Sequence, residues 1–188
     1  MTLKTHYFIA VTLPETTSIF FKNWREENKD KYSFRNWVHH EDLHITLAFL
    51  GHPDSNEQID RLKEELESKL EEIKSFQLNL QGLGTFGNSE SPRIFWAGVK
   101  QSFALTELRN WVYECCENVG FELDKKPFRP HITLARKWAE KTQFKMTSEL
   151  EEAFKEESFI VPVTAVHLVR THLDRVPKYE SVYIKSLK

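Results

Sequence analysis

One five-residue segment occurs twice in this 188-residue chain and constrains how the chain can fold. The sequence His-Ile-Thr-Leu-Ala stands at residues 44–48 and again at residues 131–135. Both copies contain β-branched residues and lack Gly and Pro, so each is predicted to form a short strand. Side chains alternate between the two faces of a strand, which places each His beside its Thr on one face. The Ile and Leu of each copy then point the other way, into a core.

The repeat extends beyond the identical residues, because predicted elements 87 residues apart match in type. A predicted strand at Tyr7 corresponds to one at Ile94, and a predicted helix at Glu15 corresponds to one at Ser102. This shared register indicates an internal duplication. A pseudo-twofold relation between two lobes would bring the two His-x-Thr motifs face to face across a groove.

The composition fits one large domain, or two small lobes that share a core. The net charge is −2, so a polyanionic partner has to be held by a local basic patch. Cys115 and Cys116 are adjacent and unsuited to a disulfide with each other, which favours a reducing compartment. The sequence shows neither a signal-peptide pattern nor an apolar run of membrane-spanning length. We therefore expect a cytoplasmic, monomeric protein without a membrane partner.

Apolar periodicity predicts the other elements of the chain. Ser55 or Asn56 is expected to cap one helix, and Gly120 is expected to end another. Strands are expected at residues 7–13, 76–80, 93–99, 159–173 and 179–187, and helices at about 15–31, 56–73, 105–119 and 148–155.

The glycine-rich segment at residues 82–87 matches the dinucleotide-binding pattern G-x-G-x-x-G and follows a predicted strand. That pattern binds a pyrophosphate only when a helix begins directly after it. Residues 88–93 contain Asn, two Ser and a Pro and do not open such a helix. We therefore reject a nucleotide site here and expect a loop.

The paired His-x-Thr motifs have the residue types that metal-free displacement at phosphorus needs. The attacking and leaving oxygens lie roughly in line on opposite sides of phosphorus. An imidazole on each side can act as base and acid, because it titrates near neutral pH. Two threonine hydroxyls can donate hydrogen bonds to the non-bridging oxygens. The candidate catalytic set is therefore His44, Thr46, His131 and Thr133, with no metal and no cofactor.

Two other functions stay open at this point. A zinc-dependent phosphohydrolase would use His44, His131 and a third histidine, although the ligand spacing of known zinc motifs is absent from the sequence. A non-catalytic binder of phosphorylated RNA ends would show salt-sensitive binding without turnover. The candidates for a third zinc ligand are His6, His39, His40, His52, His167 and His172.

Basic and aromatic residues near the motifs are further candidates. Arg136 lies five residues after His131, so a straight strand places it on the opposite face, and a bend or bulge is needed to aim it at a phosphate. Phe8, Phe49 and Trp37 lie near the expected groove and could stack on bases, although core packing is the more usual role of such residues. The basic cluster around the second motif consists of Lys125, Lys126, Arg129, Arg136 and Lys137.

The segments at residues 43–51 and 128–136 resemble the motifs of the 2H phosphoesterase superfamily, and more closely those of its LigT-like RNA 2′,3′-cyclic phosphodiesterases. The resemblance implies an α+β, bilobal fold with two antiparallel sheets lining a central cleft and helices on the outside. The strand–helix alternation by itself would suggest a parallel sheet. We expect a single domain with pseudo-repeat lobes of about 1–88 and 89–188. Further segments that fit are residues 8–10, 13–14, 92–98 and 168–171, with Tyr179.

The same resemblance implies a reaction and a role for each residue. The reaction opens a terminal RNA 2′,3′-cyclic phosphate to a 2′-phosphate without metal, and weak 2′-5′ RNA ligation is its reverse. By that likeness, His44 is the acid that protonates the departing 3′ oxygen and His131 is the base that activates water. Thr46, Thr133 and Arg136 bind the phosphate. The expected partner is RNA with 2′,3′-cyclic phosphate ends, and tRNA fragments are one source of such ends.

Overall fold

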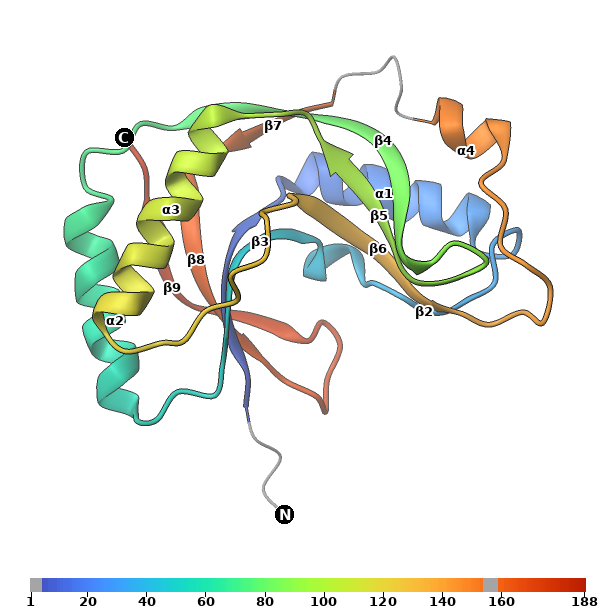
Figure 1. The fold of residues 1–188 in the computed structure, drawn as a ribbon. Helices are drawn as coiled ribbons and strands as arrows, with labels where there is room; N and C mark the ends of the chain where they lie inside the picture. Colours follow the sequence, from blue (N-terminus) through green and yellow to red (C-terminus); the bar gives the residue numbers. More distant parts are fainter. Residues whose placement is uncertain (1–4, 154–158) are drawn as a thin grey trace.

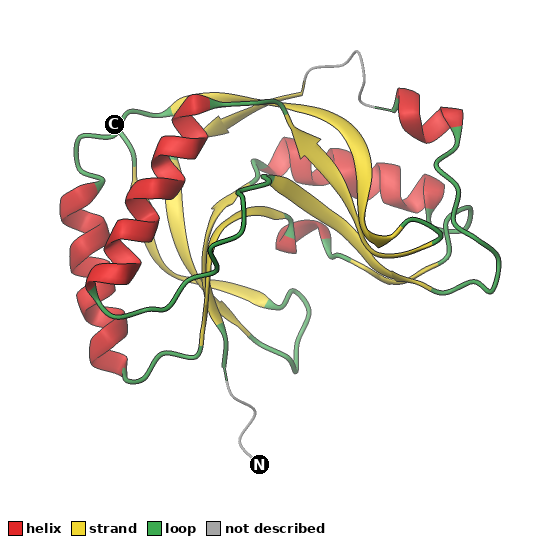
Figure 2. Ribbon diagram, in the orientation of Figure 1, coloured by secondary structure: helices red, strands yellow, loops and turns green. Residues whose placement is uncertain are grey.

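The computed structural model describes residues 5–153 and 159–188, which form a strongly curved sheet with helices on its outer sides (Figures 1 and 2). The helices of these residues are α1 (Glu15–Asn28), the short 3₁₀ helix η1 (His40–Asp42), α2 (Asn56–Lys69), α3 (Phe103–Asn118) and α4 (Ser148–Glu152). The strands are β1 (Tyr7–Thr12), β2 (Phe34–Trp37), β3 (His44–Gly51), β4 (Phe76–Asn88), β5 (Ser91–Val99), β6 (His131–Trp138), β7 (Phe159–Val163), β8 (Ala165–Thr171) and β9 (Tyr179–Ser186).

The strands pair antiparallel in the order β7-β4-β5-β6-β3-β1-β8-β9, and β2 pairs with β6 at one side. The expected α+β class and antiparallel pairing are confirmed. The expectation of two separate sheets is wrong, because the two sheets are halves of one sheet. Ile45 pairs with Ile132 and thereby joins the halves at β3 and β6. This is the single register position recorded between these two strands in the described residues.

The two halves of the sheet are related by the sequence repeat. Ile45 and Ile132 lie 87 residues apart, and both are completely buried. The repeats also exchange elements, since β4 lies beside β5 while β8 and β9 lie with β1. Helices α2 and α3 lie side by side over the β8–β9 end of one half (Figure 1). Residues 1–88 and 89–188 therefore each contribute strands to both halves.

Helix boundaries follow the apolar spacing and the capping residues. The Ser55 hydroxyl accepts a hydrogen bond from the backbone N–H of Gln58, which confirms Ser55 as the cap of α2. Gly120 follows α3 with φ +90°, a backbone conformation that glycine adopts without steric cost. The helix expected at 148–155 ends at Glu152, and its residues 154–155 lie outside the described residues. No helix among the described residues is long and apolar enough to cross a membrane.

Three strand predictions need correction. The loop expected at 82–87 is part of β4, which runs to Asn88 and pairs with β5. The single strand expected at 159–173 is two strands, β7 and β8, separated at Thr164. The short strand β2 was not predicted, because its four residues alternate poorly and two of them are exposed.

The glycine-rich part of β4 makes room for an aromatic side chain. A Cβ added at Gly84 would overlap the indole ring of Trp96 on β5. The ring centroid of Trp96 lies 5.3 Å from that of Phe86, whose ring in turn meets the His131 ring edge-on at 4.9 Å. The glycine pattern therefore serves packing beside the second motif.

We expect Gly84→Ala to lower the free energy of unfolding by about 1–3 kcal/mol, because the added methyl group forces the Trp96 ring out of its place. Urea denaturation measures this loss. Gly82→Asn is the control, since Gly82 has open space around it and Asn tolerates its φ of +71°. Equal unfolding free energies for Gly84→Ala and the unaltered protein would contradict the packing assigned to Gly84.

Candidate active site

The two motif histidines are held in the same way. The Nδ1–H of His44 donates to the carbonyl oxygen of Asp42 at 2.7 Å, and the Nδ1–H of His131 donates to that of Arg129 at 2.7 Å. A carbonyl oxygen can only accept, so Nδ1 carries the proton in each neutral ring. Asp42 and Arg129 are themselves 87 residues apart. Each ring therefore presents Nε2 as the atom that can accept or release a proton.

The joint between the halves brings the two motifs together. Because Ile45 pairs antiparallel with Ile132, the register places His44 opposite Thr133 and Thr46 opposite His131. The Nε2 of His44 lies 3.0 Å from the Thr46 hydroxyl, which can donate to it. The four polar side chains share the face opposite to the buried isoleucines. The structure thus assembles the predicted histidine–threonine set in one place.

A bulge in each motif strand brings a third residue onto this face. The β1–β3 register skips Leu47, and the β5–β6 register skips Leu134. One extra residue reverses the alternation of side chains beyond it. Arg136 on β6 and Phe49 on β3 therefore point to the same side as the histidines. Arg136 would lie on the opposite face of a straight strand, and the bulge is the deviation that it needs.

The polar set borders two pockets. The larger one has a volume of about 550 Å³ and includes His131, Thr46 and Phe49 in its lining. The smaller one, of about 110 Å³, is lined by Arg136 and Tyr179 among others. A volume of several hundred Å³ is typical of small-molecule sites. The candidate site therefore has room for a ligand larger than a phosphate group.

A model of the 2′-5′ RNA ligase superfamily matches residues 13–175, which include both motifs and both bulges. The chain belongs to the 2′-5′ RNA ligase superfamily. The predicted membership is thereby confirmed.

Relatives within the 2′-5′ RNA ligase superfamily match over most of the chain. An RNA 2′,3′-cyclic phosphodiesterase of Geobacillus stearothermophilus is 42% identical over 179 residues, which are 95% of this chain and 56% of that protein. One of Bacillus subtilis is 32% identical over 181 residues, 96% of each protein. The structure of E. coli LigT complexed with 3′-AMP superimposes with a TM-score of 0.77 at 26% identity and 99% coverage of both chains. The chain thus spans little more than half of the first of these relatives and nearly all of the others.

Burial sets the protonation of the two histidines. The pKa of His44 is lowered to about 4, mainly because the ring is removed from water. The hydrogen bond to the Asp42 carbonyl opposes this shift, and the charges of Arg136 and His131 add to it. Burial and Arg136 likewise lower the pKa of His131, against the carbonyl of Arg129. Both rings are therefore neutral at pH 7 in the free protein. A bound phosphate anion would raise both pKa values, because it favours the imidazolium form.

The three aromatic candidates lie in different environments. Phe49 is 58% exposed and lines the larger pocket, so its ring is available to a ligand. Phe8 is only 4% exposed, and its ring centroid lies 4.7 Å from that of His44. Trp37 packs against Phe95 in the core and borders the smaller pocket. Of the three, Phe49 has the position of a stacking residue, whereas Phe8 supports the His44 ring.

Asp42 was missed by reasoning from the sequence. Asp42 is 4% exposed, and its carboxylate accepts hydrogen bonds from the backbone N–H groups of Lys178 and Tyr179 at 3.0 Å. The Tyr179 ring lies edge-on to the His44 ring at 5.2 Å. One residue therefore fixes the His44 ring through its backbone and the β8–β9 hairpin through its side chain. Asp42 lies two residues before His44, and this position in the sequence does not indicate the contact with Lys178 and Tyr179.

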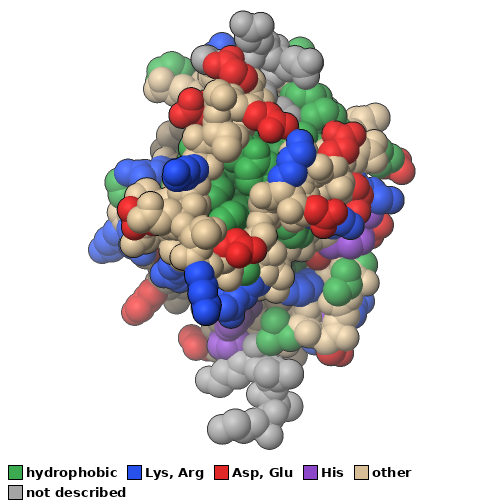
Figure 3. Space-filling view, turned by 90° about the vertical axis from the view of Figure 1, so that its right-hand side faces the viewer, with side chains coloured by type: hydrophobic (Ala, Val, Ile, Leu, Met, Phe, Trp, Pro, Cys, Tyr) green, Lys and Arg blue, Asp and Glu red, His purple; other side chains and the backbone are tan. Residues whose placement is uncertain are grey.

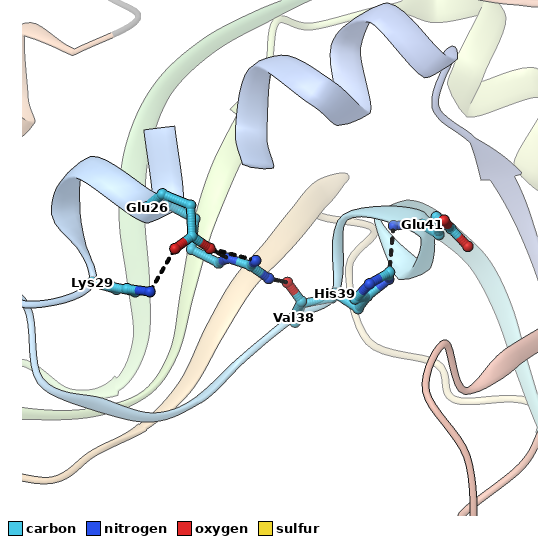
Figure 4. Close-up of polar contacts among 6 residues, drawn as sticks. Glu26, Lys29, Val38, His39 and Glu41 are labelled. Carbon is cyan, nitrogen blue, oxygen red and sulfur yellow. Dashed lines mark hydrogen bonds and ion pairs between the residues drawn. The ribbon is translucent and has the colours of Figure 1, made fainter. Parts of the chain in front are cut away.

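Helix α1 anchors the segment that leads to Asp42. Figure 4 shows the contacts around Glu26, where the Arg25 guanidinium also donates to the Val38 carbonyl at 3.3 Å. Lys29 and Arg25 pair with Glu26 and hold the pKa of its carboxyl at about 2. The His39 Nδ1 accepts the backbone N–H of Glu41 at the start of η1. The segment from Val38 to Glu41, which precedes His44, is therefore held by the Arg25 contact at Val38 and by the hydrogen bond between His39 and Glu41.

The described residues contain no group of three or more His, Cys, Asp or Glu side chains that could hold a metal ion. Two of the histidines considered as a third zinc ligand have other partners. His167 contacts the hydroxyls of Thr12 and Ser181, and His172 pairs with Glu180. A zinc site built on His44 and His131 is not assembled in this part of the chain.

We expect Asp42→Asn to lower the free energy of unfolding by about 1–3 kcal/mol. The N–H groups of Lys178 and Tyr179 both donate to Oδ1, and that of Lys178 also donates to Oδ2. An amide oxygen at the Oδ1 position therefore leaves the amide nitrogen facing the Lys178 N–H as a buried donor without an acceptor. Chemical denaturation measures the loss. Asp174→Asn is the matched control, because Asp174 is exposed in the same hairpin and should tolerate the change. A loss of similar size in both variants would show that the Asp42 carboxylate does not hold the hairpin.

Proposed function

We propose that this protein is an RNA 2′,3′-cyclic phosphodiesterase that converts a terminal 2′,3′-cyclic phosphate into a 2′-phosphate. The observation that carries the proposal is the antiparallel joint at Ile45 and Ile132, which sets two outward-facing His–Thr pairs opposite each other. The names of the relatives from G. stearothermophilus and B. subtilis state this activity for those proteins. The 3′-AMP in the LigT structure supports a nucleotide as the ligand.

The proposed reaction is an in-line displacement at phosphorus. A water oxygen attacks phosphorus while Nε2 of His131 takes the water proton, and the bond from phosphorus to O3′ breaks. Nε2 of His44 gives its proton to O3′, so the products are a 3′ hydroxyl and a 2′-phosphate. Ligation of a 5′ hydroxyl to the cyclic phosphate would be the same displacement with an alcohol in place of water.

Thr46, Thr133 and Arg136 would hold the non-bridging oxygens in this reaction. Hydroxyl and guanidinium groups donate to oxygens that gain charge in the transition state, and donors that are already in place need no reorganisation. Arg136 shares the face of the two histidines, and its positive charge lowers the pKa of each. The bulge at Leu134 is what allows a strand residue five positions after His131 to serve here.

We expect His44→Ala and His131→Ala each to lower the turnover of a 2′,3′-cyclic nucleotide by at least about 100-fold, because each removes one proton-transfer group. The assay contains a chelator and identifies the product isomer. Unchanged far-UV circular dichroism would show that both variants fold.

The matched control is His172→Ala, because this histidine pairs with Glu180 outside the proposed site and should leave turnover unchanged. Retained activity in both motif variants would contradict two-histidine catalysis. Loss of activity in chelator with recovery on adding Zn²⁺ would favour a zinc hydrolase. Salt-sensitive binding of 3′-phosphorylated RNA without turnover would favour a binding protein.

We expect the pH profile of kcat/KM to be bell-shaped with its maximum below pH 6.5, the usual pKa of histidine. The rate falls at low pH as the base becomes protonated, and at high pH as the acid loses its proton. Both limbs report the free enzyme, in which burial lowers both pKa values. The maximum of the kcat profile should lie at higher pH than that of kcat/KM, since the bound phosphate stabilises the imidazolium form of the histidines. A kcat/KM maximum above pH 7 would contradict the buried, low-pKa site.

A further inference from the structure

Arg109 on α3 lines the larger pocket together with Tyr113 and Phe128, and the same pocket is lined by Thr46 and His131 of the motif strands. Its guanidinium carbon lies 3.4 Å from the ring centroid of Tyr113 and 5.6 Å from that of Phe128. Such stacking restrains the orientation of a guanidinium. The pocket therefore has one wall with a cation in a defined position.

Within residues 5–153 and 159–188, no acidic side chain forms an ion pair with Arg109. Among the described residues, its recorded polar partner is the neutral amide oxygen of Asn110 at 3.3 Å, and its Nε is buried without an acceptor. Lys126 lines the same pocket, but its ammonium group pairs with Asp124 at 2.9 Å. Arg109 thus has spare hydrogen-bond donors and an available positive charge, whereas Lys126 is already paired.

The residues around Arg109 indicate which class of anionic ligand this positive charge could bind. Aromatic rings line the same pocket as Arg109 and His131, and one of them, Phe49, is exposed. Aromatic rings together with cations are typical of single-stranded nucleic-acid sites. Acidic and basic side chains are interspersed on the face seen in Figure 3. The net charge of the chain is −2, so attraction of RNA has to rely on local groups. The aromatic lining residues are Phe49, Phe86, Tyr113 and Phe128.

We propose that Arg109 binds the internal phosphate that joins the terminal nucleotide of the substrate to the nucleotide before it. The larger pocket then holds the last nucleoside between the histidines and α3. This inference rests on the proposed function, because it places the cyclic phosphate at His44 and His131. It makes Arg109 a specificity-determining residue that selects RNA ends over free cyclic nucleotides.

The test compares two substrates that end in the same 2′,3′-cyclic nucleotide, one a mononucleotide and the other a dinucleotide with one internal phosphate. We expect the unaltered protein to have a kcat/KM about tenfold higher for the dinucleotide. Arg109→Gln should remove this preference and leave the mononucleotide unchanged. A dinucleotide with an uncharged methylphosphonate linkage should lose the preference in the unaltered protein as well.

The controls separate charge from packing. Lys126→Gln should leave the preference intact, because Lys126 is paired with Asp124. Arg109→Lys should retain part of it, since the charge remains. An equal effect of Arg109→Gln on both substrates, or no preference in the unaltered protein, would overturn the inference while leaving the proposed function standing.

A binding measurement keeps the inference testable if turnover is absent. Calorimetric titration with a 3′-phosphorylated dinucleotide and the matching mononucleotide should show tighter binding of the dinucleotide, and Arg109→Gln should abolish the difference. This result without any hydrolysis would contradict the proposed function alone. Identical binding of the two ligands would contradict the internal-phosphate site.

Discussion

The pairing of Ile45 with Ile132 is the contact on which the candidate site depends. Both side chains are completely buried, so the apolar core fixes the side of the sheet on which they lie. The residues on either side of each isoleucine must then face the other way, because alternation along a strand is strict at short range. One hydrophobic anchor at a pseudo-twofold position therefore orients two histidines and two threonines together. A shift of this register by one residue would turn all four into the core.

The motif part of the site could be predicted from the sequence, and the bulges could not. The alternation of side chains along a strand predicts that His and Thr of each motif share a face. The internal repeat predicts that the two motifs lie close together. Strand alternation indicates that Arg136 needs a bend or bulge to reach the phosphate, but the sequence does not show where the bulge forms, because the residue skipped at Leu134 leaves no local signal. The same holds at Leu47, so Phe49 joins the cleft face by a deviation that strand periodicity does not contain. Long-range strand register decides where such a bulge forms.

The fold was predictable at the level of elements and less so in their assembly. Capping and apolar spacing located the helices because these signals are local. The exchange of strands between the repeats is a property of tertiary packing, and so is the continuity of the sheet across Ile45. The glycine-rich segment is predicted to be a loop, because glycines are typical of loops. It forms a strand instead, in which Gly84 makes room for the Trp96 ring of the neighbouring strand, and the sequence does not show that contact. Asp42 likewise gained its role from a hairpin more than 130 residues away in the sequence.

The duplicated motifs are alike in the backbone contacts of their histidines and different in the neighbouring side chains, and this asymmetry would suit the proposed RNA substrate. Asp42 and Arg129 occupy equivalent positions and hold the two histidines through equal carbonyl contacts. Their side chains differ, since one carboxylate fixes a hairpin while the other position is a cation that lines the larger pocket. Phe49 and Arg136 also occupy equivalent positions, each following a bulge, and one is aromatic while the other is a cation. An RNA end has an apolar base on one side of its phosphate and a charged backbone on the other. Two equivalent histidines cannot distinguish those sides, so in the proposed reaction the divergent neighbours would have to set the direction in which the RNA lies.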